Sequence, residues 1–545
     1  MTPAPGDPGP RSRPGQPARS AQPARSAQPG KSAQPRRSGE SGSGESRPAE
    51  RTRSGPAARP GPQAQAGPQA RRGSSRPAAG PRAGLRADPA RSAAYDVLQA
   101  VAERDAYANL MLPSLLRERG LTGRDAALAT ELAYGTLRGQ GTYDAILAVC
   151  SDRGIDQMDP PVRRVLRLGA HQLLATRIQP HAAVATSVDL ARDVAGQRPA
   201  GFVNAVLRKV ATRDLDAWIE IAAPGRAADP VGYLAVRYSH PRWIVTALRD
   251  ALGEEPGGDL TETEAALAAD GIRTLVTLCA TPGLSTAAEL VTAGGTLARW
   301  SPFGAYLAEG NPADVAAVAQ HRAAVQDEAS QLAALALTRA DACGPDRRWL
   351  DLAAGPGGKA RLLAGLAAGR DARLLAVDVR PHRAGLVRAA TAGNGRAAVL
   401  AADGLAPAWR PAVFDRVLAD VPCSGLGALR RRPEARWRRT PADVAGLGGL
   451  QRGLLAAALD SARPGGVVAY VTCSPHLAET REVVAAVLAA RDDVQVLDAP
   501  ALLPEVPGLR CPPGNGRYAQ FWPHRHGTDG IFLALLRRTA PGLPA

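Results

Sequence analysis

Lysine is nearly absent from this chain: Lys31, Lys209 and Lys359 are the only lysines among its 67 basic residues. The chain also lacks any apolar run near the roughly 18 residues that a membrane span needs. Its N-terminus has no apolar stretch of the signal-peptide kind. These absences argue against a membrane protein and predict a cytoplasmic one.

Cysteine is scarce as well, and no two of the six cysteines have CxxC spacing. This pattern indicates neither a zinc site nor a disulfide framework, so we expect no metal. Free thiols in a reducing compartment are the natural interpretation. The six are Cys150, Cys279, Cys343, Cys423, Cys473 and Cys511.

The net charge of +16 is typical of a nucleic-acid-binding protein, but most of it lies near the N-terminus. Residues 1–87 hold 16 basic and 4 acidic residues, a net charge of +12. Their repeated Pro-Ala-Arg-Ser-Ala-Gln-Pro units are poor in aliphatic side chains, which predicts a disordered tail. This tail either binds phosphate backbones loosely or is only a solvated extension.

The rest of the chain divides by its hydrophobic pattern. From residue 88 to about 225, apolar residues recur at helical spacing without strand signals, which predicts an all-α bundle. After Tyr238 short strands and helices alternate, and Arg273–Leu278 has the pattern of a strand. Beyond residue 325, strands alternate with Gly-rich or acidic turns and helices, which is typical of a parallel α/β sheet.

Three successive strands of this last region end in an acid, at Asp378, Asp403 and Asp420. Open α/β sheets bind ligands at the carboxyl ends of their strands. Counted from Trp349–Leu352 as the first strand of the region, the acid after the second strand, Asp378, suits a ribose diol, and the acid after the third, Asp403, suits an adenine amino group. The three acids therefore predict a site for S-adenosylmethionine.

A Gly-rich turn follows the strand Trp349–Leu352, which comes before the three strands that end in an acid. Its glycines allow the backbone to approach a ligand closely. A Walker phosphate loop is excluded, because that spacing needs Gly at position 353 and Ser or Thr at position 360, and a dinucleotide fingerprint matches poorly. The turn consists of Ala353, Ala354, Gly355, Pro356, Gly357, Gly358 and Lys359.

Cys423 and Cys473 each follow a buried-strand pattern and precede a serine. C5 of cytosine is too electron-poor to attack a methyl sulfonium until a nucleophile adds to C6, and a thiolate does this well. One cysteine would attack, and the other would assist release. The pair therefore suggests methylation of cytosine at C5.

Several segments resemble bacterial 16S ribosomal RNA cytosine-C5 methyltransferases of the RsmB type, whose N-terminal domain is NusB-like. The helical region contributes Arg91–Leu98, Glu131–Arg138 and Phe202–Arg208 to the resemblance. The α/β region contributes the Gly-rich turn, Val325–Gln331 and His526–Phe532.

The Gly-rich turn departs from the family pattern at its two ends. In the family it usually reads Cys-Ala-Ala-Pro-Gly-Gly-Lys-Thr, and here Ala353 and Ala360 replace the cysteine and the threonine. The Pro-Gly-Gly-Lys core is intact.

The resemblance implies a multidomain protein that acts on 16S ribosomal RNA, with S-adenosylmethionine as cofactor, as a monomer and without a membrane partner. Its parts are a disordered basic Pro/Ala/Arg-rich tail (1–87), a NusB-like all-α RNA-binding domain (88–225), a linker with a small α/β RNA-recognition subdomain (226–324), and a Rossmann-like α/β methyltransferase domain (325–540).

The resemblance also implies residue roles. Cys473, in Thr-Cys-Ser-Pro, is the nucleophile, and Cys423, in Pro-Cys-Ser-Gly, helps to free the product. DNA cytosine-C5 enzymes attack from a Pro-Cys after the fourth strand, so the reverse assignment stays open. Asp420 is close enough in sequence to accept hydrogen bonds from the amino edge of the base, and Lys359 pairs with it. The expected cofactor contacts are residues 353–359, Asp378, Asp403 and Asp420.

Arginines crowd the segment after Cys423. Arginine together with an aromatic ring offers phosphate contacts and a stacking face for an unpaired base. We expect RNA contacts from Arg430, Arg431, Arg432, Arg436 and Trp437.

Two other functions remain open. One is a transfer RNA cytosine-C5 methyltransferase, and the other is a non-catalytic NusB-like RNA-binding or antitermination protein. An N4-cytosine or N6-adenine enzyme is disfavoured, because such enzymes carry an aromatic residue after Asp-Pro-Pro, whereas Asp420-Val421-Pro422 leads into Cys423.

Overall fold

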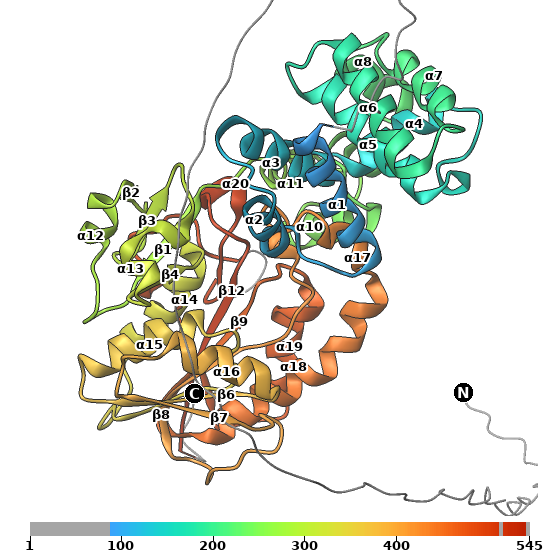
Figure 1. The fold of residues 1–545 in the computed structure, drawn as a ribbon. Helices are drawn as coiled ribbons and strands as arrows, with labels where there is room; N and C mark the ends of the chain where they lie inside the picture. Colours follow the sequence, from blue (N-terminus) through green and yellow to red (C-terminus); the bar gives the residue numbers. More distant parts are fainter. Residues whose placement is uncertain (1–87, 512–515, 541–545) are drawn as a thin grey trace, which may run out of the picture. The chain divides into compact units, whose positions relative to one another are not determined.

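The computed structural model describes residues 88–511 and 516–540 (Figure 1). The predicted disordered tail, residues 1–87, lies outside the described residues. Among the residues described, no helix is both long and apolar enough to cross a membrane. The same ranges contain no group of three or more His, Cys, Asp or Glu side chains that could hold a metal ion.

The first described part is an all-α bundle, as predicted. Its first helix begins where Asp88 accepts a hydrogen bond from Arg91 N and Pro89 takes the first helical position. Apolar faces of the helices meet in one core that includes Leu132 and Leu166. The helices are α1 (Pro89–Glu103), α2 (Ala108–Glu118), α3 (Gly123–Arg138), α4 (Gln140–Cys150), α5 (Pro160–Ala175), α6 (Pro180–Ala195), α7 (Ala200–Val210) and α8 (Leu215–Ala222).

A second helical group and a small sheet follow. The helices are α9 (Pro230–Arg237), α10 (Arg242–Leu252) and α11 (Thr261–Asp270). The sheet has the order β2-β3-β1-β4 and is antiparallel throughout. Its elements are β1 (Val276–Ala280), α12 (Ala287–Thr292), β2 (Gly295–Leu297), β3 (Gly304–Leu307), α13 (Ala316–Ala319) and β4 (Ala323–Val325). The strand predicted from Arg273 begins only at Val276, because its partner β3 pairs from Val276 onward.

The last part is built on a large mixed sheet of order β10-β12-β9-β8-β5-β6-β7, with β11 paired to β12. Strands β5 to β9 are parallel to one another, whereas β12 is antiparallel to β9 and β10. The strands are β5 (Arg348–Asp351), β6 (Arg373–Asp378), β7 (Ala397–Ala401), β8 (Phe414–Asp420), β9 (Ala462–Thr472), β10 (Val494–Leu497), β11 (Ala519–Gln520) and β12 (Phe532–Arg538).

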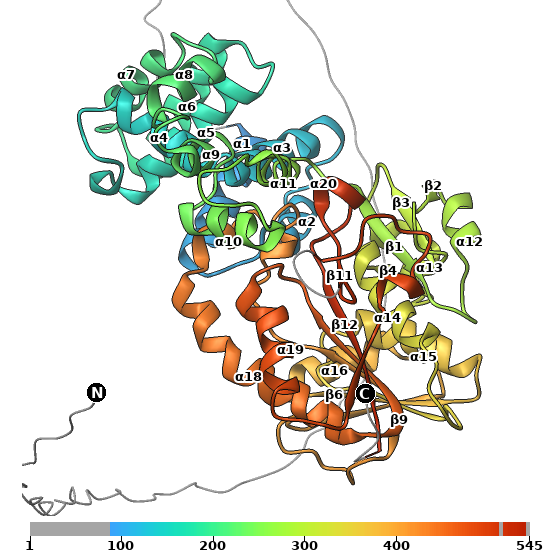
Figure 2. The same ribbon diagram turned by 180° about the vertical axis from the view of Figure 1, so that it is seen from behind.

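Helices cover both faces of this sheet. Figures 1 and 2 show α14 and α15 on one side and α18 and α19 on the other. The central strands are buried on both sides, since Leu418 of β8 packs in the core of α14 and α15 while Val417 packs in the core of α18 and α19. The helices are α14 (Glu328–Arg339), α15 (Gly358–Ala368), α16 (Pro381–Ala390), α17 (Ala435–Arg438), α18 (Pro441–Ser461), α19 (Arg481–Leu488) and α20 (Pro523–His526).

Candidate active site at the carboxyl edge of the large sheet

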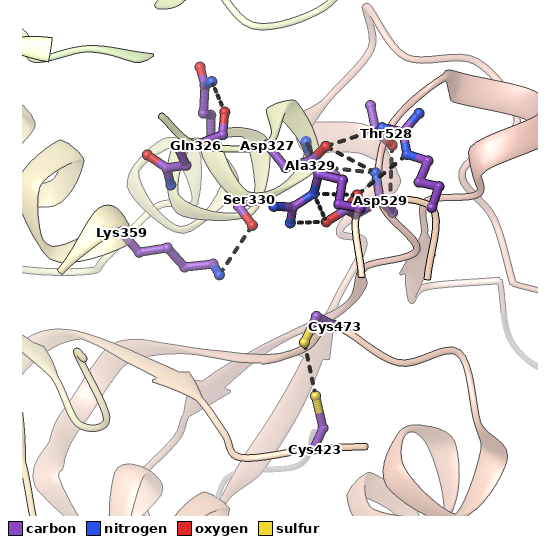
Figure 3. A network of polar contacts seen from close by, with 12 residues as sticks. Gln326, Asp327, Ala329, Ser330, Lys359, Cys423, Cys473, Thr528 and Asp529 are labelled. Atoms are coloured by element: carbon purple, nitrogen blue, oxygen red, sulfur yellow. Dashed lines mark hydrogen bonds and ion pairs between the residues drawn. The ribbon is translucent and has the colours of Figure 1, made fainter. Parts of the chain in front are cut away.

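The topology brings the two predicted cysteines together. Strands β8 and β9 are parallel neighbours, with Asp420 opposite Val471, so the residues that follow both strands lie at the same edge. Cys423 Sγ lies 3.1 Å from Cys473 Sγ. Figure 3 shows the two side chains pointing toward each other. Cys423 and Cys473, which are fifty positions apart in the sequence, therefore lie together because each follows one of two adjacent strands.

A buried carboxylate fixes the backbone around this pair. Glu479 is fully buried and accepts hydrogen bonds from both the backbone N–H, at 2.7 Å, and the hydroxyl of Ser424. The hydroxyls of Ser424 and Ser474 are 3.1 Å apart. The serine that follows each cysteine is therefore tied to the other serine. This arrangement holds both thiols with little freedom to separate.

The pair is electrostatically asymmetric. The hydrogen bond between the two thiols lowers the pKa of Cys473 below its ordinary value, although burial opposes this effect. The same hydrogen bond, together with burial, raises the pKa of Cys423 well above its ordinary value. Of the two sulfurs, Cys473 is therefore the one whose ionisation this hydrogen bond favours.

Lys359 and Asp420 form the ion pair that the sequence predicted, with Nζ 2.8 Å from Oδ2. Burial lowers the pKa of Lys359, but the pairing with Asp420 outweighs burial and raises it. The ammonium also lies 3.4 Å from the Ser330 hydroxyl. The two charges act on the Cys473 thiol in opposite directions, because Asp420 raises its pKa and Lys359 lowers it.

The backbone of the Gly-rich turn lies close to Asp378, the last residue of β6. Gly355 N donates to Asp378 Oδ2 at 3.1 Å, and a Cβ at Gly355 would lie 2.3 Å from that oxygen. Gly357 has φ +114°, where glycine is favoured over other residues. Asp403 is exposed, lies beyond the end of β7 at Ala401, and accepts from Leu405 N.

A buried acid at the end of β5 tests whether S-adenosylmethionine fits here. Asp351 is 1% exposed, and neither of its carboxylate oxygens has a hydrogen-bond partner among the described residues. Burial, with Asp420 nearby, raises its pKa to about 8. A buried acid with no side-chain partner, beside a turn of mostly small residues, suits a ligand that is cationic and rich in donors. The residues present therefore fit this cofactor.

The arginine segment departs from its predicted role at one position. Arg436 is fully buried, and its guanidinium donates to the backbone carbonyls of Arg138, Ser239 and Asp270. The RNA contact predicted for Arg436 is therefore wrong, because no face of the side chain is left for a phosphate. Arg432 and Trp437 are exposed, and their RNA contact stays a prediction.

Arg430 and Arg431 point toward two buried carboxylates instead of outward. Arg431 is paired with Asp529, and Arg430 Nη2 lies 3.3 Å from Asp327. Asp529 N also donates to Asp327 Oδ1, so the two acids meet (Figure 3). RNA contacts by Arg430 and Arg431 stay a prediction. Both guanidinium groups are already paired with carboxylates, so a phosphate would share them with Asp327 and Asp529.

Sequence reasoning missed three acids of this site: Asp327, Asp351 and Glu479. Asp327 lies in a segment matched to the family only as a flank of the cofactor site, and Asp351 is hidden inside an apolar strand. Glu479 follows Cys473 at a distance that no spacing rule singles out. The one available signal was that each acid lies within seven residues of a motif already identified.

Comparison with known proteins agrees with this geometry. The family described as 16S rRNA methyltransferase RsmB/F matches residues 340–537, and the NusB family matches residues 88–212. A putative methyltransferase of Mycobacterium tuberculosis is 53% identical over 453 residues, which are 83% of this chain and 97% of that protein.

More distant relatives carry a more specific name. A ribosomal RNA small subunit methyltransferase B of Pseudomonas syringae pv. tomato is 34% identical, over 83% of this chain and 97% of its own length. The protein PH0851, known from a crystal structure, shares the fold with a TM-score of 0.66 and 21% identity, over 83% of this chain and 100% of that one. The chain belongs to the RsmB/F family of S-adenosylmethionine-dependent 16S rRNA methyltransferases.

Proposed function

We propose that this protein methylates C5 of a cytosine in 16S ribosomal RNA through a covalent bond between Cys473 and C6 of the base. The observation that carries the proposal is the cysteine pair, with sulfurs 3.1 Å apart and a hydrogen bond from Cys423 that lowers the pKa of Cys473. The relatives named as small-subunit methyltransferases support the choice of RNA.

The proposed chemistry begins at Cys473. Its thiolate adds to C6, and the new S–C6 bond makes C5 nucleophilic enough to take a methyl group. The methyl group comes from S-adenosylmethionine, whose sulfonium makes the methyl carbon electrophilic. Removal of the C5 proton by a base then lets the C6–S bond break, and the electron pair returns to Cys473.

Cys423 assists the last of these steps. Its thiol keeps its proton and donates a hydrogen bond to the sulfur of Cys473, so it stabilises the negative charge that returns to that sulfur as the product leaves. The same contact favours Cys473 over Cys423 as the nucleophile. If Cys423 were the nucleophile instead, the thiol with the raised pKa would have to ionise before Cys473.

The remaining site residues hold the reactants. Asp420, fixed by Lys359, accepts hydrogen bonds from the amino edge of the cytosine. The turn at 353–359, Asp378, Asp403 and Asp420 bind the cofactor, with Asp378 toward the ribose and Asp403 toward the adenine. Arg432 and Trp437 contact the RNA from the exposed side of the segment after Cys423.

Bisulfite sequencing of ribosomal RNA tests this function. A strain without the protein should lack one modified cytosine in 16S RNA, and the wild-type gene should restore it whereas Cys473→Ala should not. A cytosine lost from transfer RNA instead would move the activity to that substrate. No change in any RNA would support the non-catalytic alternative.

A further inference from the structure

The segment that follows Cys423 caps the ends of helices outside the catalytic sheet. Arg436 donates to Arg138 O and Asp270 O, the last residues of α3 and α11. Arg438 donates to Val101 O, in the last turn of α1, at 2.7 Å. Glu434 accepts from Ala108 N, the first residue of α2, at 3.4 Å.

These contacts satisfy groups that a helix cannot satisfy by itself. The last four carbonyls and the first four N–H groups of each helix have no partner within it. The charges also match the helix dipoles, since the arginines meet carboxyl ends and Glu434 meets an amino end. Glu434, Arg436 and Arg438 of one short segment therefore hold three helices of the N-terminal helical domain, and Arg436 also holds α11.

Trp437 and Tyr107 add packing to this interface. A Cβ at Gly141 of α4 would lie 2.4 Å from the Trp437 ring, so that ring rests directly on the helix backbone. The guanidinium groups of Arg432 and Arg438 lie 5.0 Å and 5.6 Å from the centre of the Tyr107 ring. Such contacts stabilise an interface beyond its hydrogen bonds.

The other end of the same segment reaches the cysteine pair. Arg439 Nε donates to Ser424 O, next to Cys423, at 3.0 Å. Gly427 N donates to Cys473 O at 2.9 Å, and Gly530 N donates to Gly427 O at 2.7 Å. A chain of direct contacts thus runs from the helix ends through Arg438 and Arg439 to the backbone that carries Cys423.

We propose that the N-terminal helical domain positions Cys423, and that Arg436, Arg438 and Arg439 are the positioning residues through which it acts. The helical domain would then serve the release step as well as RNA capture. This inference rests on the proposed function, because it takes Cys423 to assist product release. A thiol displaced by even 1 Å can lose about a hundredfold in rate.

The test is a turnover assay with full-length protein, S-adenosylmethionine and 16S RNA from a strain that lacks the protein. Arg438→Ala should lower kcat about tenfold or more, leave KM for RNA within about twofold of wild type, and accumulate a denaturant-resistant protein–RNA adduct. Arg438→Lys should recover part of the rate, since one ammonium can still reach a carbonyl. Arg410→Ala, in the exposed loop before β8 at the opposite end of that strand, is the matched control.

The outcomes distinguish a failure of this inference from a failure of the proposed release role of Cys423. If Cys423→Ala forms no adduct, the release role itself fails. If Cys423→Ala forms an adduct but Arg438→Ala only raises KM, Arg438 is an RNA contact and the inference is wrong. If Arg438→Ala fails to fold, Arg439→Ala is measured in the same assay, because it removes only the hydrogen bond to Ser424 O. An accumulated adduct in Arg439→Ala supports the inference. The absence of an adduct overturns it.

Discussion

At the scale of single residues, the charge state of two sulfurs decides the chemistry. The two thiols share a hydrogen bond, which stabilises a thiolate at Cys473 and so lowers the pKa of Cys473. An unperturbed cysteine titrates near about 8.5. The rate of adduct formation should therefore rise with pH through a lower midpoint than it would have without this hydrogen bond.

This asymmetry can be measured in single-turnover experiments. Cys423→Ala removes the donor, so the midpoint of adduct formation should move to higher pH, whereas Cys423→Ser keeps a donor and should move it less. Rapid quenching from pH 6 to 10 would record both profiles. An identical midpoint in the wild type and in both variants would mean that Cys423 does not tune Cys473.

The buried acid Asp351 links pH to stability. Its pKa is raised by burial to about 8, while an unfolded aspartate titrates near about 4. Between these values the folded form holds a proton that the unfolded form has lost, so stability falls as pH rises through the window. Without cofactor, Asp351→Asn should remove this slope, as read from denaturant unfolding at pH 5, 7 and 9. An unchanged slope would show that Asp351 is ionised in the folded protein.

Asp378 and Asp403 should contribute unequally to cofactor affinity. A hydrogen bond to a charged group contributes about 1.5 to 3 kcal/mol, or roughly tenfold to a hundredfold in affinity. Asp378→Asn should weaken binding more than Asp403→Asn, because Asp378 also holds Gly355 N of the turn while Asp403 is exposed. Calorimetry with S-adenosylmethionine measures both. Wild-type affinity in both variants would place the adenosine elsewhere.

At the scale of elements, the central parallel strands of the large sheet were predictable and long-range packing was not. The terminal acid of β6 is visible in the sequence, and the strand ends at Asp378 as predicted. The sequence predicted that β7 ends at Asp403, but the strand ends at Ala401. Asp403 follows an apolar run as the other two acids do, yet it accepts a hydrogen bond from Leu405 N in a turn. Arg436 looked like an RNA contact because a charge pattern does not reveal which arginine is buried.

The loop after β8 depends on one glycine that no local pattern explains. A Cβ at Gly427 would lie 1.8 Å from Gly530 O, an impossible contact with backbone. Gly427→Ala should therefore destabilise the protein by more than about 2 kcal/mol and displace the Cys423 loop. The control is Gly446→Ala in α18, where a Cβ meets nothing within 4 Å and helix propensity should add up to about 1 kcal/mol. Thermal unfolding compares the two, and equal stabilities would contradict the close approach.

At the scale of the whole molecule, charge and specificity are expected in different parts. Residues 1–87 hold +12 of the net +16. Deleting them should weaken RNA binding and flatten its salt dependence, while the melting temperature and the modified cytosine stay the same. Binding isotherms from 50 to 300 mM salt, with bisulfite sequencing, measure both effects. A truncated protein that methylates a different cytosine would place specificity in those residues.

The central claim is that Cys473 bonds to the base and Cys423 releases it. The most direct measurement is mass spectrometry of the RNA-linked peptide from Cys423→Ala, trapped during turnover with S-adenosylmethionine and digested with protease and nuclease. The account predicts one methylated cytidine attached to the peptide that contains Cys473, and no such species in Cys473→Ala. A nucleotide attached through Cys423 in the Cys473→Ala protein, with none in Cys423→Ala, would contradict it.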